Sequence, residues 1–523
     1  MLSVLINWFI HREDNIELLQ YHNYLVCGLI YCSCRLSLDL SYKCVKSITL
    51  LLVIVLFVVQ LLIGCYQIVN SIVLHNYNSI LIYGSFNNSG SYAGFLSVCI
   101  CILFPICYKG EKKEHKLLLY LIAISLFVIV ITLCRTALLA LVVFFLLFNR
   151  HENYIFISLK RIKYLIPIGL VLLVILFFIK QKSAIGRLYL YVIDLRALFE
   201  NGLMGSGLGG FTSSFMMAQK SLFAPAIIES QGSFNISGLT YSVSNYADLF
   251  TEAFNDYLKI GIELGPLALI LYLGILSCSI KALYLADISN CGGLVCMAVL
   301  SMLYFPLSIL ANKIIVFVII SFASYYQSRY VIKRFDVLKP VFLSLTVVTM
   351  VFCIPFYLKR AKAEKEYFDA YTIWYNRQKY PQFIEDTQPL FNMLKHNERF
   401  CYSLADAYYQ LGDYPSSIMV INEGLKCCYS NELLQLLGEN YERTNDIDKA
   451  EYCYKEAFRI IPNRIKPLWH LSKLYFETDQ IEKLLSLSDQ INHFKPKIES
   501  NLVLNYRKEV DFFVEQVGTK NCL

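Results

Sequence analysis

The sequence predicts an all-α protein in which a polytopic helical membrane body of about nine to eleven spans precedes a small solenoid of helical hairpins. Hydrophobic residues make up 56% of the 523 residues and charged residues only 17%, and the apolar residues lie in long runs. After residue 358 these runs stop, and a pattern with a period of about 34 residues begins. The chain therefore divides into a membrane body at 1–358, a linker with a degenerate helical hairpin at 359–397, and a repeat tail at 398–523.

The charge and cysteine patterns exclude several classes of function. The net charge of +7 is spread over short loops, so it indicates membrane topology and offers no continuous basic face to nucleic acid. The 18 cysteines form no C-x-x-C ladder and no histidine-spaced cluster, and many lie inside apolar runs. We therefore expect no metal site, no disulfide framework and no cofactor.

Apolar runs that are long enough to cross a bilayer, or nearly so, alternate with polar loops. They cover residues 24–34, 48–68, 92–108, 117–148, 164–179, 257–280, 294–310, 314–326 and 341–358. The shortest, 24–34, either crosses the membrane or lies at its surface. The run 117–148 contains Arg135 near its middle, and the loops on both sides of it are basic. We therefore expect two short crossings there, with Arg135 at the outer surface.

The positive-inside rule orients these spans. Lys43 and Lys46 precede the span 48–68 and place its start in the cytoplasm. Counting crossings from there puts one long polar loop, residues 181–256, and the repeat tail on the outer side. Four basic residues follow the last span directly and argue for the opposite side of the tail, namely Lys359, Arg360, Lys362 and Lys365. We keep the outer placement because it satisfies four separate basic loops upstream.

The tail resembles the tetratricopeptide repeat, a pair of antiparallel helices with large, small, aromatic and proline residues at set positions. In the clearest unit these positions hold Leu434, Leu437, Gly438, Tyr441, Ala450, Tyr454, Ala457 and Pro462. The flanking units match less closely. Each hairpin buries its apolar face only against its neighbours, so two or three units with a degenerate leader make a small solenoid. Its recognisable residues are packing positions, and we expect the tail to bind a protein partner and to do no chemistry.

The long loop holds the candidate functional residues, because it is the one long polar stretch inside the membrane body. Arginine beside lipid usually marks a site or an anchor, and its planar guanidinium group suits a diphosphate. We therefore assign substrate binding to Arg135, Arg187, Arg196, Gly205, Gly207 and Asn255, and Glu252 and Asp256 lie in the same stretch. The glycines either let backbone amides approach phosphate or form a tight turn between two helices.

Four segments resemble the bacterial family of O-antigen ligases and polymerases. They are GSFNNSGSYAGFL at 84–96, TLCRTALLAL at 132–141, GRLYLYVIDLRALFENGLMGSGLGGF at 186–211 and AFNDYLKIGIELG at 253–265. The resemblance implies transfer of a glycan from an undecaprenyl-diphosphate carrier to lipid A core, to a growing polysaccharide or to protein. It also implies a multi-pass inner-membrane protein that acts on the periplasmic face without a metal or a nucleotide sugar. Several members carry a tetratricopeptide tail.

The chain departs from that family at the proposed base. Phe254 stands before Asn255 where the ligases usually have histidine, and Cys134 precedes Arg135 where they have serine. We expect Glu252 or Asp256 to take the proton of the acceptor hydroxyl, because a partly desolvated carboxylate is basic enough to do so. The arginines would hold the diphosphate and stabilise its growing charge as it leaves.

A flippase or solute carrier for a lipid-linked or anionic substrate is the alternative. Carriers place charges or broken helices near the bilayer midplane, between two repeated halves. The sequence shows no such repeat, and its arginines lie at the ends of spans.

Overall fold

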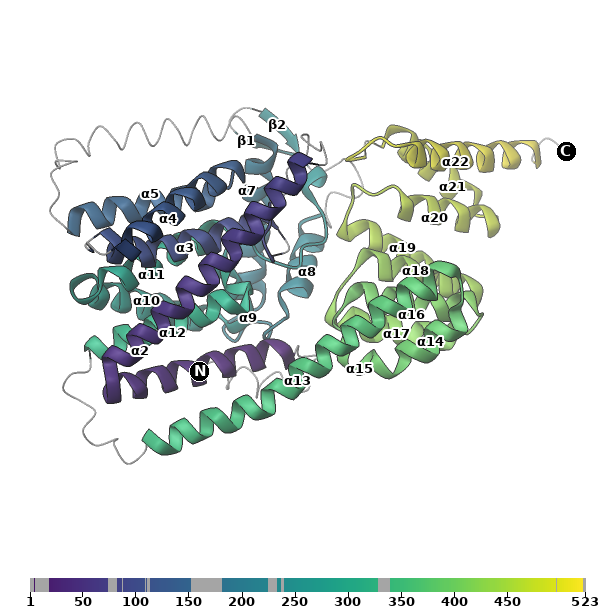
Figure 1. Ribbon diagram of the computed structural model, residues 1–523. Coiled ribbons are helices and arrows are strands. Elements are labelled where there is room, and N and C mark those ends of the chain that lie inside the picture. The colour runs from purple at the N-terminus through teal and green to yellow at the C-terminus, as the bar shows by residue number, and fades with distance from the viewer. Residues whose placement is uncertain are drawn as a thin grey trace.

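The computed structural model is predominantly helical (Figure 1). It describes residues 4, 18–73, 82–86, 88–108, 110, 113–151, 181–223, 233–236, 239–327, 339–494 and 496–520. The predicted span 164–179 lies outside the described residues.

The membrane body is a bundle of long apolar helices around α3. Its helices are α2 (Leu18–Val73), α3 (Ser89–Tyr108), α4 (Lys113–Ile131), α5 (Arg135–His151), α10 (Pro266–Ala286), α11 (Ile288–Leu303), α12 (Leu310–Gln327) and the first part of α13 (Lys339–Ile373). Within the described ranges five of them, α2, α3, α4, α10 and α12, are long and apolar enough to span a membrane. Most side chains of α3 are buried, and α11, α4 and α5 surround it.

Helix α2 consists of two arms that meet at a kink at Ser41. The first arm packs on α12 and α13: the Lys313 Nζ donates to Gln20 at one end, and Tyr42 hydrogen-bonds Tyr326 at the other. The first arm of α2 therefore extends from one end of the bundle to the other. The run 24–34 thus belongs to a helix longer than the run itself, which packs along the bundle.

The apolar run 117–148 is two helices, as the loop charges predict. Residues 132–134 form a turn, Leu133 has a φ of 52°, and α5 begins at Arg135. The run 257–280 contains one apolar helix long enough to span, as predicted, but the predicted bounds are wrong. A short helix, α9 (Asp256–Leu264), ends at Gly265, and α10 begins at Pro266. Gly265 has a φ of 87° and the proline ring cannot continue a helix, so the chain turns there.

Contacts at the two ends of the bundle show that its helices alternate in direction. One end has the pairs Gln67–Gly84, Asn88–Tyr304 and Arg187–Phe254. The other end has the pairs Tyr42–Tyr326, Lys46–Asp287 and His151–Tyr284. The described helix ends thus lie in two separate layers, in the order that the crossing count expects.

The long loop folds into helices and one hairpin at the first of these ends. It contains α7 (Gln181–Glu200), α8 (Phe211–Phe223), the antiparallel strands β1 (Ser233–Ile236) and β2 (Leu239–Ser242), and the 3-10 turn η3 (Val243–Tyr246). Helix α9 returns the chain to the membrane body.

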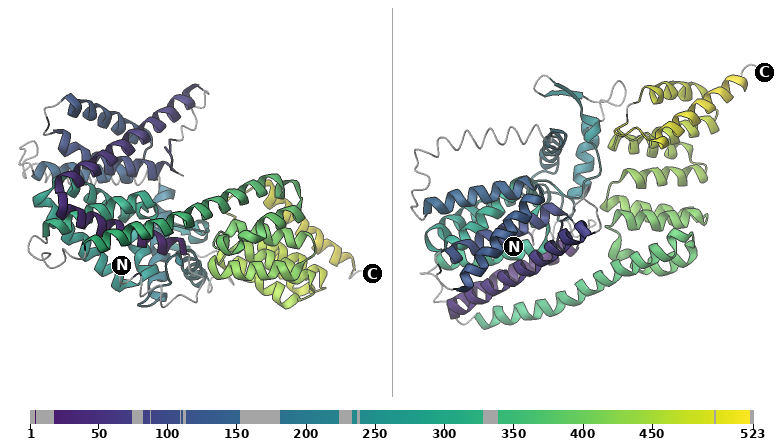
Figure 2. Two further views of the ribbon diagram at one scale, coloured as in Figure 1. Left: turned by 60° about the horizontal axis from the view of Figure 1, so that its bottom comes forward. Right: turned by 45° about the horizontal axis from the view of Figure 1, so that its top comes forward.

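The tail is a stack of helix pairs that starts without a break from α13 (Figure 2). After α14 (Tyr380–Thr387), η7 (Gln388–Leu390) and α15 (Phe391–Leu394) come three hairpins and a last helix. They are α16 (Glu398–Gln410) with α17 (Tyr414–Cys427), α18 (Asn431–Arg443) with α19 (Ile447–Ile460), α20 (Lys466–Glu477) with α21 (Ile481–His493), and α22 (Asn501–Lys520). Gly438 is small because the Tyr454 ring fills the space beside it. The segment 359–397, predicted as a linker with a degenerate helical hairpin, is mostly helical, and its residues pack into the first layer of the tail.

The tail packs against the long loop. Leu434, Ala457, Ile460 and Ile461 share one apolar cluster with side chains of α7 and α8. Figure 2 shows α8 between the membrane body and the helix pairs of the tail. The loop and the tail therefore lie at the same end of the membrane body.

Candidate functional site

Two arginines from distant segments meet at the loop end of the bundle. Arg135 opens α5, directly after the α4–α5 turn, and Arg187 lies in the second turn of α7. Both are half-buried, and their positive charges act on one another. The guanidinium carbon of Arg187 lies 5.7 Å from the centre of the Phe254 ring. Two like charges held together in this way favour an anion between or beside them.

Polar groups of α3 and α11 adjoin this pair. The Tyr304 ring contacts Phe254 edge-on, with ring centres 6.3 Å apart. Its hydroxyl hydrogen-bonds Asn88 and, at 3.0 Å, the Ser91 hydroxyl. The structure thus brings three of the resembling segments, around residues 88, 135 and 187, together beside Phe254.

Arg196 does not join them. It lies nine residues after Arg187, about two and a half turns of helix, and therefore on the opposite face of α7. Its Nε donates to Glu200 at 2.8 Å, and Glu200 also accepts from the Ser221 hydroxyl. The spacing of nine residues would have been enough to predict that Arg187 and Arg196 lie on opposite faces of one helix.

The glycine turn is bonded to the end of α9. The amides of Ser206 and Gly207 donate to the carbonyls of Ile262 and Glu263, at 2.9 and 3.0 Å. Those of Leu208 and Gly209 donate to the Tyr21 hydroxyl and the Glu263 carboxylate, both at 3.3 Å. These donors are occupied within the protein, so the geometry favours the tight turn over a phosphate cradle for Gly205 and Gly207.

Asn255 and Asp256 hold the start of α9. The Asn255 side chain accepts from the amides of Tyr257 and Leu258, as a helix cap does. Asp256 is only 2% exposed and accepts from the Ser301 hydroxyl and, at 2.9 Å, from the Leu307 amide. Burial raises the pKa of Asp256 to about 7. Its carboxylate joins α9 to the connection between α11 and α12.

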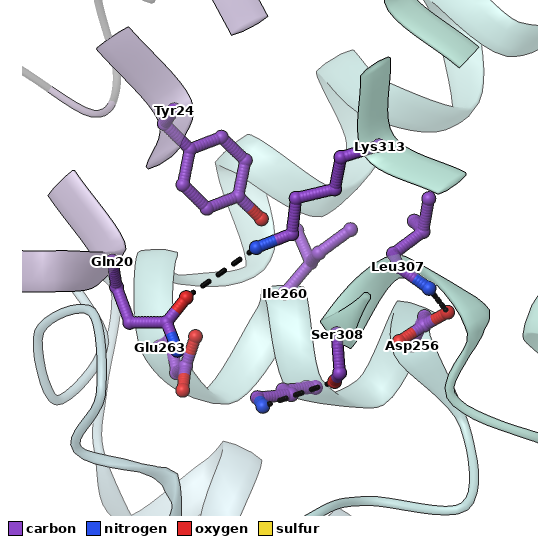
Figure 3. Close-up of a pocket in the computed structure, with 9 residues that line it drawn as sticks. Gln20, Tyr24, Asp256, Ile260, Glu263, Leu307, Ser308 and Lys313 are labelled. Atoms are coloured by element: carbon purple, nitrogen blue, oxygen red, sulfur yellow. Dashed lines mark hydrogen bonds between the residues drawn. The ribbon is translucent and has the colours of Figure 1, made fainter. Parts of the chain in front are cut away.

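Glu252 has a different environment. Its carboxylate is 2.5 Å from the Lys259 ammonium group, accepts from the Ser308 hydroxyl, and keeps about a third of its side chain exposed (32%). Lys259 also lines a small void, and Figure 3 shows Asp256, Glu263 and Lys313 around it. This void has a volume of about 20 Å³, enough for one water molecule.

A larger cavity of about 220 Å³ lies between the loop and the tail. Its walls include Glu252, Lys259 and Glu263 from the membrane body and His396, Cys427 and Cys428 from the tail. Thr251 at its edge is exposed, so the cavity reaches the surface there.

Sequence reasoning missed several charged residues of this region. Lys259 and Glu263 of α9, Lys313 of α12 and Gln20 of α2 line one small void; Glu263 and Lys313 are buried, and Lys259 and Gln20 are half-buried. A signal was present, because Lys259 and Glu263 interrupt the first turns of an apparent span and Lys313 separates two others. Asp194 was missed too. It lies about two turns after Arg187, is fully buried, and both its oxygens lack a hydrogen-bond partner among the described residues. Burial raises its pKa to about 8.

Buried hydrogen bonds join the loop to the tail. Gln219 of α8 is fully buried: it accepts from the Tyr189 hydroxyl at 2.7 Å and donates to the Ile460 carbonyl at 2.8 Å. Asn463 donates to the Ala247 carbonyl at 2.7 Å. Ion pairs surround this core, namely Lys220–Glu456, Arg464–Asp248 and Lys497–Asp248. The Arg464 and Lys497 charges hold the pKa of Asp248 below its usual range, against the effect of its partial burial.

Comparison with known proteins identifies part of the tail. Residues 432–464 match the family model of the tetratricopeptide repeat, which covers α18 and α19. A comparison with characterised proteins gives no match for the chain. Tetratricopeptide repeats generally mediate protein interactions, so the match agrees with a protein-binding tail. In the ranges that the structure describes, no group of three or more His, Cys, Asp or Glu side chains is placed to hold a metal ion.

Proposed function

We propose that the protein transfers a glycan from an undecaprenyl-diphosphate carrier to an acceptor, as O-antigen ligases and polymerases do, on the periplasmic face of the bacterial inner membrane. The acceptor is lipid A core, a growing polysaccharide or a protein. The observation that carries the proposal is that Arg135 and Arg187 lie near enough, at the loop end of the bundle beside Phe254, for their charges to act on one another. Both belong to the segments that resemble the family.

The arginine pair supplies what a diphosphate leaving group needs. Guanidinium groups bind paired phosphate oxygens, and two of them stabilise the charge that develops on the departing diphosphate. The pair lies at the ends of α5 and α7 beside apolar helices, where the head group of a carrier lipid would emerge. In this scheme Tyr304, Asn88 and Ser91 contact the first sugar.

Glu252 suits the role of base better than Asp256. The Asp256 carboxylate is buried and bonded to Ser301 and Leu307, whereas Glu252 is partly exposed and borders the large cavity. Its contacts with Lys259 and Ser308 hold the carboxylate in place at the edge of the cavity, where an acceptor hydroxyl group can reach it.

The decisive experiment replaces Arg187 with lysine. Transfer is measured from purified undecaprenyl-diphosphate glycan to acceptor, with metal chelated, in variants shown to insert and fold. We expect Arg187→Lys to lose most of its activity, because lysine keeps the charge but lacks the planar pair of donors. Arg196→Lys is the matched control on the opposite face of α7 and should keep normal rates. Full activity of Arg187→Ala would overturn the proposal.

One observation favours the alternative of a carrier. The break between α9 and α10 and the clustered charges of Lys259, Glu263 and Lys313 are features that transporters place along a substrate path. A carrier would move the lipid-linked glycan between leaflets of a vesicle without forming a new glycosidic bond. Assaying translocation and bond formation in the same vesicles separates the two functions.

A further inference from the structure

We propose that the cavity between the loop and the repeat tail binds the terminal monosaccharide of the acceptor, so that the tail forms one wall of the acceptor site. This inference rests on the proposed function. In this arrangement the membrane body alone binds the donor, and the membrane body and the tail together bind the acceptor.

The size and the walls of the cavity fit one sugar. Its volume of about 220 Å³ equals roughly seven water molecules at about 30 Å³ each. Thr212, Thr251 and Gln20 add hydroxyl and amide groups to the carboxylates, and Phe211 adds an apolar wall. Sugars present hydroxyl groups around a partly apolar ring, and such mixed walls suit them.

The charge of the cavity excludes a diphosphate. Glu252 and Glu263 supply two carboxylates against the single ammonium group of Lys259. A phosphate would meet these carboxylates at close range, whereas the hydroxyl groups of a sugar donate hydrogen bonds to them. The arginine pair therefore suits the diphosphate of the donor, whereas this cavity suits the sugar of the acceptor.

The two sites are close enough for one reaction. Glu252 borders the cavity. Phe254, two residues later, contacts the Arg187 guanidinium group through its ring. Two residues of extended chain span at most about 7 Å. A sugar in the cavity can thus present its hydroxyl group toward a donor whose diphosphate lies on the arginines.

The step balances without another reactant. The acceptor oxygen forms a bond to the anomeric carbon of the donor, and the bond from that carbon to the diphosphate oxygen breaks. Its electron pair leaves with the diphosphate, whose charge the arginines stabilise. The proton of the acceptor hydroxyl passes to the Glu252 carboxylate.

The test uses the full chain in detergent and two probes. Methyl glycosides of glucose, galactose and N-acetylglucosamine report the acceptor site, and inorganic pyrophosphate reports the arginine pair, both by saturation-transfer NMR. Thr251→Trp places a bulky ring at the exposed edge of the cavity. Thr372→Trp, at an exposed threonine of α13, is the matched control.

We expect at least one glycoside to bind, with its affinity lowered tenfold or more by Thr251→Trp and by His396→Ala and unchanged by Thr372→Trp. Pyrophosphate should bind all of these variants equally and should not displace the glycoside. No glycoside binding, unchanged binding in Thr251→Trp, or displacement by pyrophosphate would each overturn the inference. Failure of the proposed function would appear separately, as pyrophosphate binding that Arg187→Ala does not change.

Discussion

Gln219 offers the most direct test of the contact between loop and tail. It is fully buried between α7, α8 and the end of α19, and it bonds Tyr189 on one side and the Ile460 carbonyl on the other. Gln219→Leu keeps a similar volume but removes the acceptor of the first bond and the donor of the second. The buried Tyr189 hydroxyl and the Ile460 carbonyl then lose these partners.

The expected cost follows from those two groups. Each buried polar group left without its partner costs about 1–3 kcal/mol, so Gln219→Leu should weaken the closed interface by about 2–6 kcal/mol. In the double variant Tyr189→Phe with Gln219→Leu, the hydroxyl no longer needs an acceptor, so about 1–3 kcal/mol of this loss should return. Gln410→Leu, at an exposed glutamine of the tail, should change stability by less than about 0.5 kcal/mol.

Hydrogen exchange of the amides in α8 and α19, measured by mass spectrometry in detergent, reports the opening of this interface. Gln219→Leu should speed exchange there by tenfold or more, and transfer activity should fall because α7 carries both Tyr189 and Arg187. Equal exchange rates in Gln219→Leu and Gln410→Leu would refute the reasoning, since they would mean that the tail does not hold the loop in this way.

Three further predictions concern other parts of the chain. Gly205→Ala should destabilise the protein far more than Gly202→Ala: both have positive φ, at 72° and 68°, but only at 205 would the new carbon lie 2.5 Å from the Glu263 carbonyl oxygen. Thermal unfolding of the two variants checks this, and equal midpoints would contradict it. Asp194 is buried without a partner among the described residues and its pKa is raised to about 8, so it binds a proton more tightly in the folded state. Stability should therefore fall as pH rises from about 4 to about 8, and Asp194→Asn should reduce this fall, of which the part due to Asp256, whose pKa is raised to about 7, remains. An unchanged pH profile in the variant would show that Asp194 does not contribute to it. A reporter active only in the cytoplasm should be silent both when fused after residue 523 and when inserted in the 181–256 loop. Opposite results at the two positions would contradict the packing of the tail on the loop, because that packing requires both to lie on the same side.

Much of the architecture follows from local pattern. Apolar runs of about 20 residues require helices in a bilayer, because only a helix bonds every backbone group within the segment. The charges around Arg135 predicted the turn between α4 and α5, and the spacing of Leu434, Gly438 and Tyr454 predicted a tetratricopeptide hairpin. Each of these signals lies within a few tens of residues and reports on its own segment.

The sequence by itself therefore determined a helical chain with several helices apolar enough to cross a membrane and a repeat tail, because hydropathy and helical periodicity act along the chain. Only the tertiary structure decided which residues meet. It placed Arg135 near Arg187, and Arg196 on the far face of α7. It also brought Lys259 and Lys313 to one small void, and it bonded the glycine-turn amides to the end of α9. It also docked the tail on the loop and thereby formed a cavity that neither part has alone. These contacts join segments far apart in the chain, and they depend on shape and on the pairing of buried polar groups, which a local pattern does not encode.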